Sequence, residues 1–225
     1  MESVVEPAAE RILHIEASPR GTDSFSARTA SAFLDEYRRG HPQAVVEELR
    51  LFEHPLPEFD SEAAAQKMAH IASLMRGEKG IAPVGKWAAV VAEIERLKAA
   101  DKILISTPMW NFSIPYRLKH YLDVIIQPGL AFYVNRKGEY IGLFRARQVQ
   151  LIIASGSAYA DGFPREDGGT KTDFLQAYLL HIFRWIGFKD IRILRIQPTA
   201  DAKPEAVQAM AGQKLEEARA AARLF

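Results

Sequence analysis

Short apolar runs alternate with amphipathic helical patterns along almost the whole chain. Five apolar runs predict buried strands, and they lie at residues 12–17, 45–51, 103–107, 149–154 and 191–196. Between and after them, apolar residues spaced three and four positions apart predict helices. These patterns cover residues 30–40, 62–76, 85–99, 115–127, 174–185 and 203–224.

This order of elements is typical of parallel β-α-β units, with helices on both faces of one sheet. Five such strands fit the flavodoxin-type order 2-1-3-4-5 and predict a three-layer α/β sandwich. The second run is less apolar than the first, which indicates a position near an edge of the sheet. We expect residues 1–225 to form a single domain, with residues 1–10 as a disordered lead-in and 131–143 as a hairpin excursion.

Composition narrows the class of protein. The chain has no cysteine, which excludes iron–sulfur clusters, thiolate nucleophiles and disulfides. Its 29 basic and 28 acidic residues give no excess charge for nucleic acid or an anionic membrane. Residues 1–11 lack the apolar segment of a signal peptide, and no apolar run approaches membrane-spanning length. We therefore expect a cytoplasmic protein that binds neither nucleic acid nor membranes.

The loop after the first predicted strand is rich in hydroxyl groups. Open parallel sheets bind ligands beyond the carboxyl ends of their strands, and Ser18, Ser24 and Ser26 stand there, just before a helix. Hydroxyls and free N–H groups at a helix N-terminus suit a phosphate. The loop has neither G-x-G-x-x-G nor a P-loop motif, so a monophosphate fits best. The same serines could instead only cap the helix, and the segment alone favours neither interpretation.

The loop after the third predicted strand combines large apolar side chains with an amide. It reads Pro108, Met109, Trp110, Asn111 and Phe112. Such a loop offers apolar walls and polar edge contacts to a flat heteroaromatic ring. The alternative is that its aromatic residues pack into the core or a subunit contact. Their density at the carboxyl end of a strand favours the ring site.

A third loop, after the fourth predicted strand, contains mostly small residues. It reads Ser155, Gly156, Ser157, Ala158 and Tyr159. Small residues let the backbone approach a ligand closely, and their N–H groups can donate to an electron-rich ring edge. An ordinary strand-to-helix turn is the alternative.

These segments resemble the FMN-dependent NADH-azoreductases, within the flavodoxin-like NAD(P)H:quinone reductase superfamily. The resemblance runs from Leu13 to Ala220. Beyond residues 108–112 it is most specific at Leu118, Lys119, Tyr121, Asp123, Gly129 and Phe132. It implies one tightly bound, non-covalent FMN.

The resemblance assigns roles to the three loops. Ser18, Ser24, Phe25 and Ser26 would hold the flavin phosphate. Residues 108–112 would line the isoalloxazine, and residues 155–158 would contact its pyrimidine edge. We expect Phe132 and Tyr159 to line the substrate pocket.

The resemblance also implies an enzyme. NADH or NADPH would reduce the flavin, which would then reduce a quinone or an azo compound by two-electron hydride transfer with ping-pong kinetics. No catalytic side chain and no metal are expected, because the cofactor carries the hydride chemistry. Two alternatives remain: a flavodoxin-type electron carrier without nicotinamide-dependent activity of its own, and an α/β module with no cofactor.

Two positions depart from the family pattern. Many relatives read Ser-Arg-Gly-Gly at residues 155–158, so Gly156 removes a positive charge, and Trp110 replaces a more common tyrosine. Family members are homodimers, and the 115–127 helix, with Tyr121 and Ile125, is the expected interface. We expect His181, on the apolar face of its helix, to be a core or interface residue.

Overall fold

A five-stranded parallel sheet forms the centre of the molecule. The structure is a computed structural model that describes residues 9–144, 148–159 and 173–225, so residues 1–8 of the expected lead-in lie outside the described residues. The strands are β1 (Arg11–Glu16), β2 (Val45–Arg50), β3 (Lys102–Pro108), β6 (Gln148–Ala154) and β7 (Asp190–Ile196). Their order, β2-β1-β3-β6-β7, confirms the predicted topology and the edge position of the second strand.

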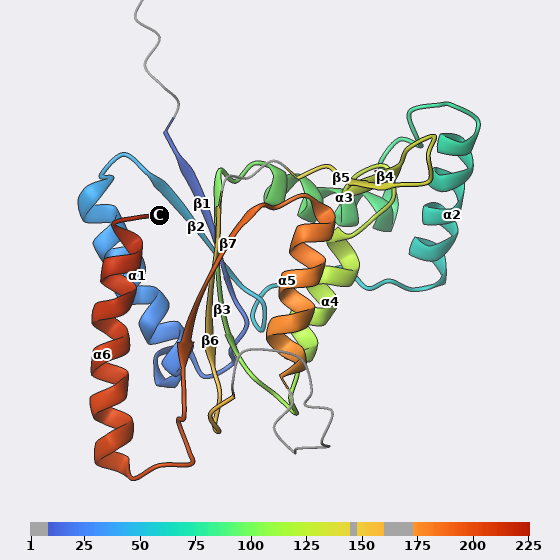
Figure 1. The fold of residues 1–225 in the computed structure, drawn as a ribbon. Coiled ribbons are helices and arrows are strands. Elements are labelled where there is room, and N and C mark those ends of the chain that lie inside the picture. Colours follow the sequence, from blue (N-terminus) through green and yellow to red (C-terminus); the bar gives the residue numbers. More distant parts are fainter. Residues whose placement is uncertain (1–8, 145–147, 160–172) are drawn as a thin grey trace, which may run out of the picture.

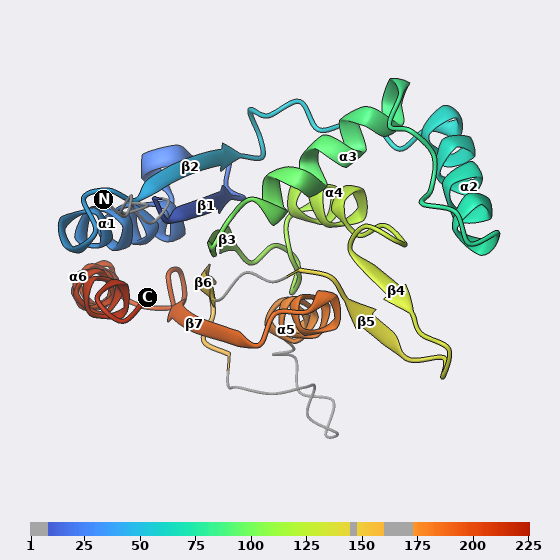
Figure 2. The same ribbon diagram turned by 90° about the horizontal axis from the view of Figure 1, so that it is seen from above.

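Helices cover both faces of this sheet, as Figures 1 and 2 show. One face carries α1 (Phe25–Gly40), which follows the short 3-10 helix η1 (Gly21–Asp23), and α6 (Pro204–Ala222). The other carries α3 (Gly85–Lys98), α4 (Tyr116–Ile125) and α5 (Phe174–Ile186). Helix α2 (Ser61–Met75) lies outside this layer, beyond α3. In the described ranges, no helix combines the length and apolar character needed to cross a bilayer.

The central strands read as continuous apolar runs because both of their faces are buried. Leu13 and Ile105 belong to the core beneath α3, α4 and α5, whereas Ile12 and Leu104 belong to the core beneath α1 and α6. This alternation along each strand fixes its register, since a slip of one residue would exchange the two faces.

One face of helix α4 is buried in the core. Tyr121 and Ile125 have no exposed surface and pack in the same core as Leu13 and Ile105. The expectation that these two side chains contact a partner subunit is therefore wrong, because their apolar spacing reflects burial inside the chain, whereas an interface on the exposed side of the helix stays a prediction.

The hairpin consists of β4 (Phe132–Val134) and β5 (Tyr140–Gly142), which pair antiparallel. In Figure 1 it lies at the top, level with the amino ends of the strands. The absence of a side chain at Gly142 lets the hairpin approach the end of α5 closely, because a Cβ there would lie 2.1 Å from the carbonyl carbon of Ile186. The hairpin therefore lies at the opposite end of the central sheet from the loops that follow the carboxyl ends of the sheet strands.

His14 is a buried histidine in the middle of β1. Its side chain is 3% exposed, and Nε2 shares a hydrogen bond of 2.9 Å with Ser106 Oγ. Nδ1 is buried and has no hydrogen-bond partner in the described part of the chain. Burial lowers the pKa of His14 from 6.5 to about 4, and the nearby Arg50 and Arg38 act in the same direction.

This histidine makes stability depend on pH. The unfolded chain binds a proton below pH 6.5, but the folded chain binds it only near pH 4, so acid favours unfolding between these values. We expect the free energy of unfolding to fall by up to about 3 kcal/mol across this window because of His14 alone. Urea unfolding between pH 7 and pH 5 should show a shallower pH dependence in His14→Leu than in the wild type. His41→Gln, on an exposed histidine, is the control, and equal slopes in wild type and His14→Leu would contradict the prediction.

Candidate functional site

The three predicted loops meet at one end of the sheet. They follow β1, β3 and β6, which are neighbours in the sheet, and lie at the bottom in Figure 1. Backbone hydrogen bonds continue to the strand ends, from Ala17 N–H to Ser106 O (2.8 Å) and from Met109 N–H to Ala154 O (2.7 Å). The loops therefore begin at the same level, at the switch point of the sheet.

The serine loop places buried hydroxyls at the start of α1. Ser18, Ser24 and Ser26 are all buried. Ser24 caps the helix, since its Oγ accepts the N–H of Ala27 at 3.4 Å, and it lies 3.0 Å from Ser26 Oγ. The N–H groups of Phe25 and Ser26 belong to the first turn and have no intrahelical acceptor. Capping and phosphate binding are compatible here, and these donors at the positive end of a helix fit a phosphate monoester.

The aromatic loop contains a tight turn with unusual backbone angles. Trp110 and Ser113 exchange two backbone hydrogen bonds of 2.9 Å, which close a two-residue turn. Asn111 and Phe112, at its centre, have φ of 47° and 68°. Asparagine tolerates this left-handed region, but for phenylalanine it costs about 1–3 kcal/mol. Phe112 is nevertheless 46% exposed, so burial of its ring within this chain does not explain the strain.

Trp110 belongs to an aromatic cluster that sequence reasoning missed. Its ring centroid lies 5.6 Å from Phe52 and 6.2 Å from Tyr116. Phe52 follows β2, and the loop that carries it is held by α4: Arg117 Nε donates to Leu51 O at 2.7 Å. In the sequence, only the position of Phe52 just after a predicted strand could have indicated that it lies near the site. The cluster gives the apolar wall a fixed support.

The third loop combines buried and exposed positions. Ser155 is buried, whereas Gly156 and Ala158 are exposed. Ser155 Oγ lies 3.0 Å from Ser157 O and 3.1 Å from Gln197 Oε1, so these two acceptors share its one proton, and Tyr159 ends the loop. A Cβ on Gly156 would meet only Ala200 Cβ, at 3.5 Å, which is ordinary contact. Packing therefore leaves room for a side chain at this position.

The structure does not bring Phe132 to these loops. Its ring lies in the hairpin, 4.4 Å from the ring of Trp185 at the end of α5 and 5.8 Å from Tyr140. The opposite end of α5 is the one near the site, because Phe174 N–H donates to Phe112 O at 3.0 Å. Helix α5 thus separates Phe132 from the site of its own chain.

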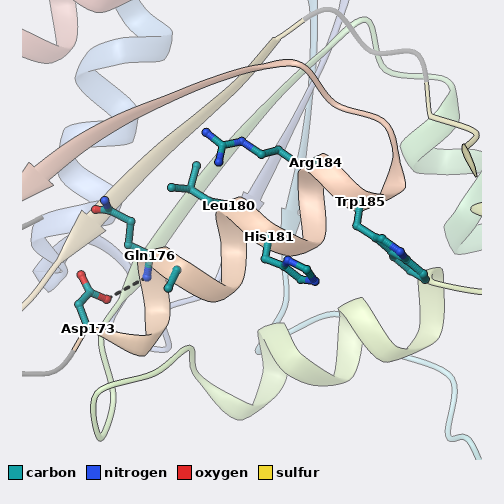
Figure 3. Close-up of a pocket in the computed structure, with 7 residues that line it drawn as sticks. Asp173, Gln176, Leu180, His181, Arg184 and Trp185 are labelled. Carbon is teal, nitrogen blue, oxygen red and sulfur yellow. Dashed lines mark hydrogen bonds between the residues drawn. The ribbon is translucent and has the colours of Figure 1, made fainter. Parts of the chain in front are cut away.

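The outer side of α5 carries an open hollow of about 580 Å³ (Figure 3). Its lining comes from two ridges of residues four positions apart, Gln176, Leu180 and Arg184 on one and Ala177, His181 and Trp185 on the other, with Asp173 at the end. Figure 3 shows His181 and Trp185 pointing to one side and Leu180 and Arg184 to the other. His181 is exposed here, so the expectation of a core residue is wrong and that of an interface residue stays a prediction.

Together, this topology and the loops at its switch point define the flavodoxin-like class. Residues 10–220 match the model of the family described as flavodoxin-like fold. The chain is 43% identical over 208 residues to an "FMN-dependent NADH:quinone oxidoreductase" of Nitratidesulfovibrio vulgaris (strain DP4), covering 92% of this chain and 96% of that protein. A protein of the same name from Desulfotalea psychrophila is 35% identical over 217 residues, covering 96% and 98%.

The structure also resembles that of an FMN-dependent NADH-azoreductase from Bacillus anthracis, solved in complex with FMN. The TM-score is 0.76 at 27% identity, covering 94% of this chain and 98% of the other. This chain therefore belongs to the flavodoxin-like family and, within it, to the group of these oxidoreductases and azoreductases.

The strained turn can be tested by substitution. Phe112→Gly and Phe112→Ala both remove the ring, but only glycine adopts φ of 68° without steric cost. Urea unfolding should show Phe112→Gly more stable than Phe112→Ala by about 1 kcal/mol. Equal stabilities, or a more stable alanine variant, would mean that the turn stores no strain at this position.

Proposed function

We propose that this chain is an FMN-dependent NAD(P)H oxidoreductase that reduces quinones or azo compounds. The observation that carries the proposal is the meeting of the serine loop and the strained aromatic turn at the switch point of the sheet. The names of its relatives support the same activity. The exposed ring of Phe112 further suits a site that stacks a flat molecule.

In this proposal the three loops bind different parts of FMN. Ser18, Ser24 and Ser26, with the N–H groups of Phe25 and Ser26, hold the phosphate. Pro108, Met109, Trp110, Asn111 and Phe112 line the isoalloxazine. Ser155, Gly156, Ser157 and Ala158 present backbone N–H groups to its pyrimidine edge.

The side chains orient the reactants, while bound FMN supplies the capacity to accept and to donate a hydride. Trp110 and Phe112 would hold the ring system, and the exposed turn formed by Asn111 and Phe112 would leave room for a second molecule beside it. The nicotinamide and the acceptor would use this room in turn, with Tyr159 beside it. Alternating use of one site predicts ping-pong kinetics.

NADH is the proposed electron donor, because the names of the relatives specify it.

Reduced nicotinamide is a cytosolic reductant. A chain without cysteine has no disulfide to gain from an oxidising compartment. We therefore place the enzyme in the cytoplasm.

We further propose a homodimer built on α5. The two ridges beside its hollow suit helix packing of the i±4 kind. In a two-fold interface the same surface meets itself, and we propose a two-fold axis perpendicular to α5, which makes the two α5 helices antiparallel. Phe132 of the partner subunit, which packs beside the C-terminal end of α5, would then approach the site at the N-terminal end. This arrangement would give Phe132 its expected place in a substrate pocket.

The activity can be tested with the visible flavin spectrum. Under anaerobic conditions the purified chain with one equivalent of FMN should be bleached by NADH and recover its colour when benzoquinone is added. Initial rates varied against both substrates should give parallel double-reciprocal lines. Lack of FMN uptake would refute the cofactor assignment, and a bound flavin that NADH does not bleach would instead support an electron carrier.

The dimer can be tested with a charge on α5. Leu180→Arg should convert a dimer into a monomer in sedimentation velocity and reduce NADH:quinone turnover at least tenfold, because Phe132 of the partner subunit is lost. Met75→Arg, on α2 where the residue is 84% exposed, is the matched control and should stay dimeric. A wild-type monomer with full activity would remove the dimer proposal.

A further inference from the structure

One side-chain amide closes the loop after β6 at both of its ends. Gln197 directly follows β7, and its Oε1 accepts from Ser155 Oγ at 3.1 Å and from Tyr159 N–H at 3.2 Å. Its Nε2 donates to Tyr159 O at 2.8 Å. Residues 155 and 159 are therefore tied to the same group, and the residues between them form a short bridge.

The chain beyond Gln197 holds the middle of the same loop. The N–H groups of Thr199, Ala200 and Asp201 all point to Gly156 O, at 3.0, 3.0 and 3.2 Å. Three successive donors on one carbonyl oxygen fix the direction of the peptide that follows Gly156. Residues 199–201 thus help to set the direction in which the backbone N–H groups of this loop point.

Arg195 fixes the orientation of the amide. Its Nε donates to Gln197 Oε1 at 3.1 Å, so this oxygen faces three donors and only one assignment of the amide fits. Its Nη1 donates to Gln176 Oε1 at 2.7 Å and to the carboxylate of Asp173. The guanidinium and this carboxylate are almost fully buried, which is the setting in which such a pair fixes geometry.

The network continues to the aromatic turn. Asp173 caps α5, with Oδ1 accepting Gln176 N–H at 2.9 Å. The next residue, Phe174, donates its N–H to Phe112 O at 3.0 Å. Two loops of the candidate site are thus connected through residues of β7 and α5, none of which the three predicted segments contain.

We propose that Gln197 is a positioning residue for the flavin, oriented by Arg195. This inference rests on the proposed function, because the loop it holds is the one assigned to the pyrimidine edge of FMN. Gln197 acts through the loop and does not touch the ring. It sets the direction of the N–H groups of residues 156–158, which determines how well they donate to the ring edge.

The test compares Gln197→Met with Gln213→Met. Methionine matches glutamine in length but makes none of the four hydrogen bonds of the amide, whereas Gln213 on α6 bonds only to Glu217 at the surface. Three quantities are measured: amide exchange of residues 155–159 without FMN, the Kd for FMN, and the midpoint potential of the bound flavin.

We expect faster exchange of residues 155–159 in Gln197→Met, a Kd for FMN raised about tenfold, and a shifted midpoint potential. Gln213→Met should match the wild type in all three. Gln197→Glu keeps an oxygen that can accept the same three hydrogen bonds, but its second carboxylate oxygen would face the carbonyl oxygen of Tyr159 and repel it. It should therefore fall between wild type and Gln197→Met, and it gives the same test if the methionine variant does not fold.

Two results would overturn the proposal, and they are distinguishable. Faster exchange with unchanged FMN affinity and potential would show that Gln197 supports only the fold. Failure of the wild-type chain to take up FMN would overturn this proposal together with the proposed function.

Discussion

The parallel pairing of β1 with β3 is the constraint on which the rest of the structure depends. Their register runs from Ile12 opposite Lys102 to Glu16 opposite Ser106, although α1, β2, α2 and α3 separate them in sequence. This register makes the loops that follow the two strands start at the same level. The serine loop and the aromatic turn thus become neighbours through the sheet, without direct contact being required to align them. Because crossovers of parallel strands are right-handed, the same pairing also divides the helices between the two faces.

The loops at the carboxyl ends of the strands are held by side chains from other elements. Arg117 binds the carbonyl of Leu51 after β2, and Gln197 after β7 binds Ser155 and Tyr159. Loop backbone has no ladder to satisfy its polar groups, so half-buried side chains provide partners. The shape of the candidate site therefore depends on residues that lie beside or beneath it. Substitutions at these supports would alter the site without changing any group that faces a ligand.

The sequence predicted all five sheet strands and their order, because runs buried on both faces leave a strong apolar signal. It also located the three loops, since the carboxyl ends of neighbouring strands must meet. Long-range placement was beyond it. Tyr121 and Phe132 are both apolar residues in regular elements, yet one lies in the core and the other at the far end of the molecule from the loops. Gln197 carries no motif, and its role appears only when β7 is placed beside β6. The predicted position of the three loops is confirmed, whereas their roles in binding stay predictions.

The glycine at position 156 gives the positioning network its importance. Among the described residues, a Cβ at this position would meet only Ala200 Cβ, at ordinary contact distance, so packing does not require glycine here. Residues 155–159 include no charged side chain, so a ligand edge at this loop would meet hydroxyl groups and backbone dipoles. A charge attracts over a wide range of directions, but an N–H group donates well only within a narrow range of angles. A loop that binds through N–H groups must accordingly be held more rigidly than one that carries a cation. The dense hydrogen bonding of residues 155–159 to residues 197–201 is consistent with this requirement.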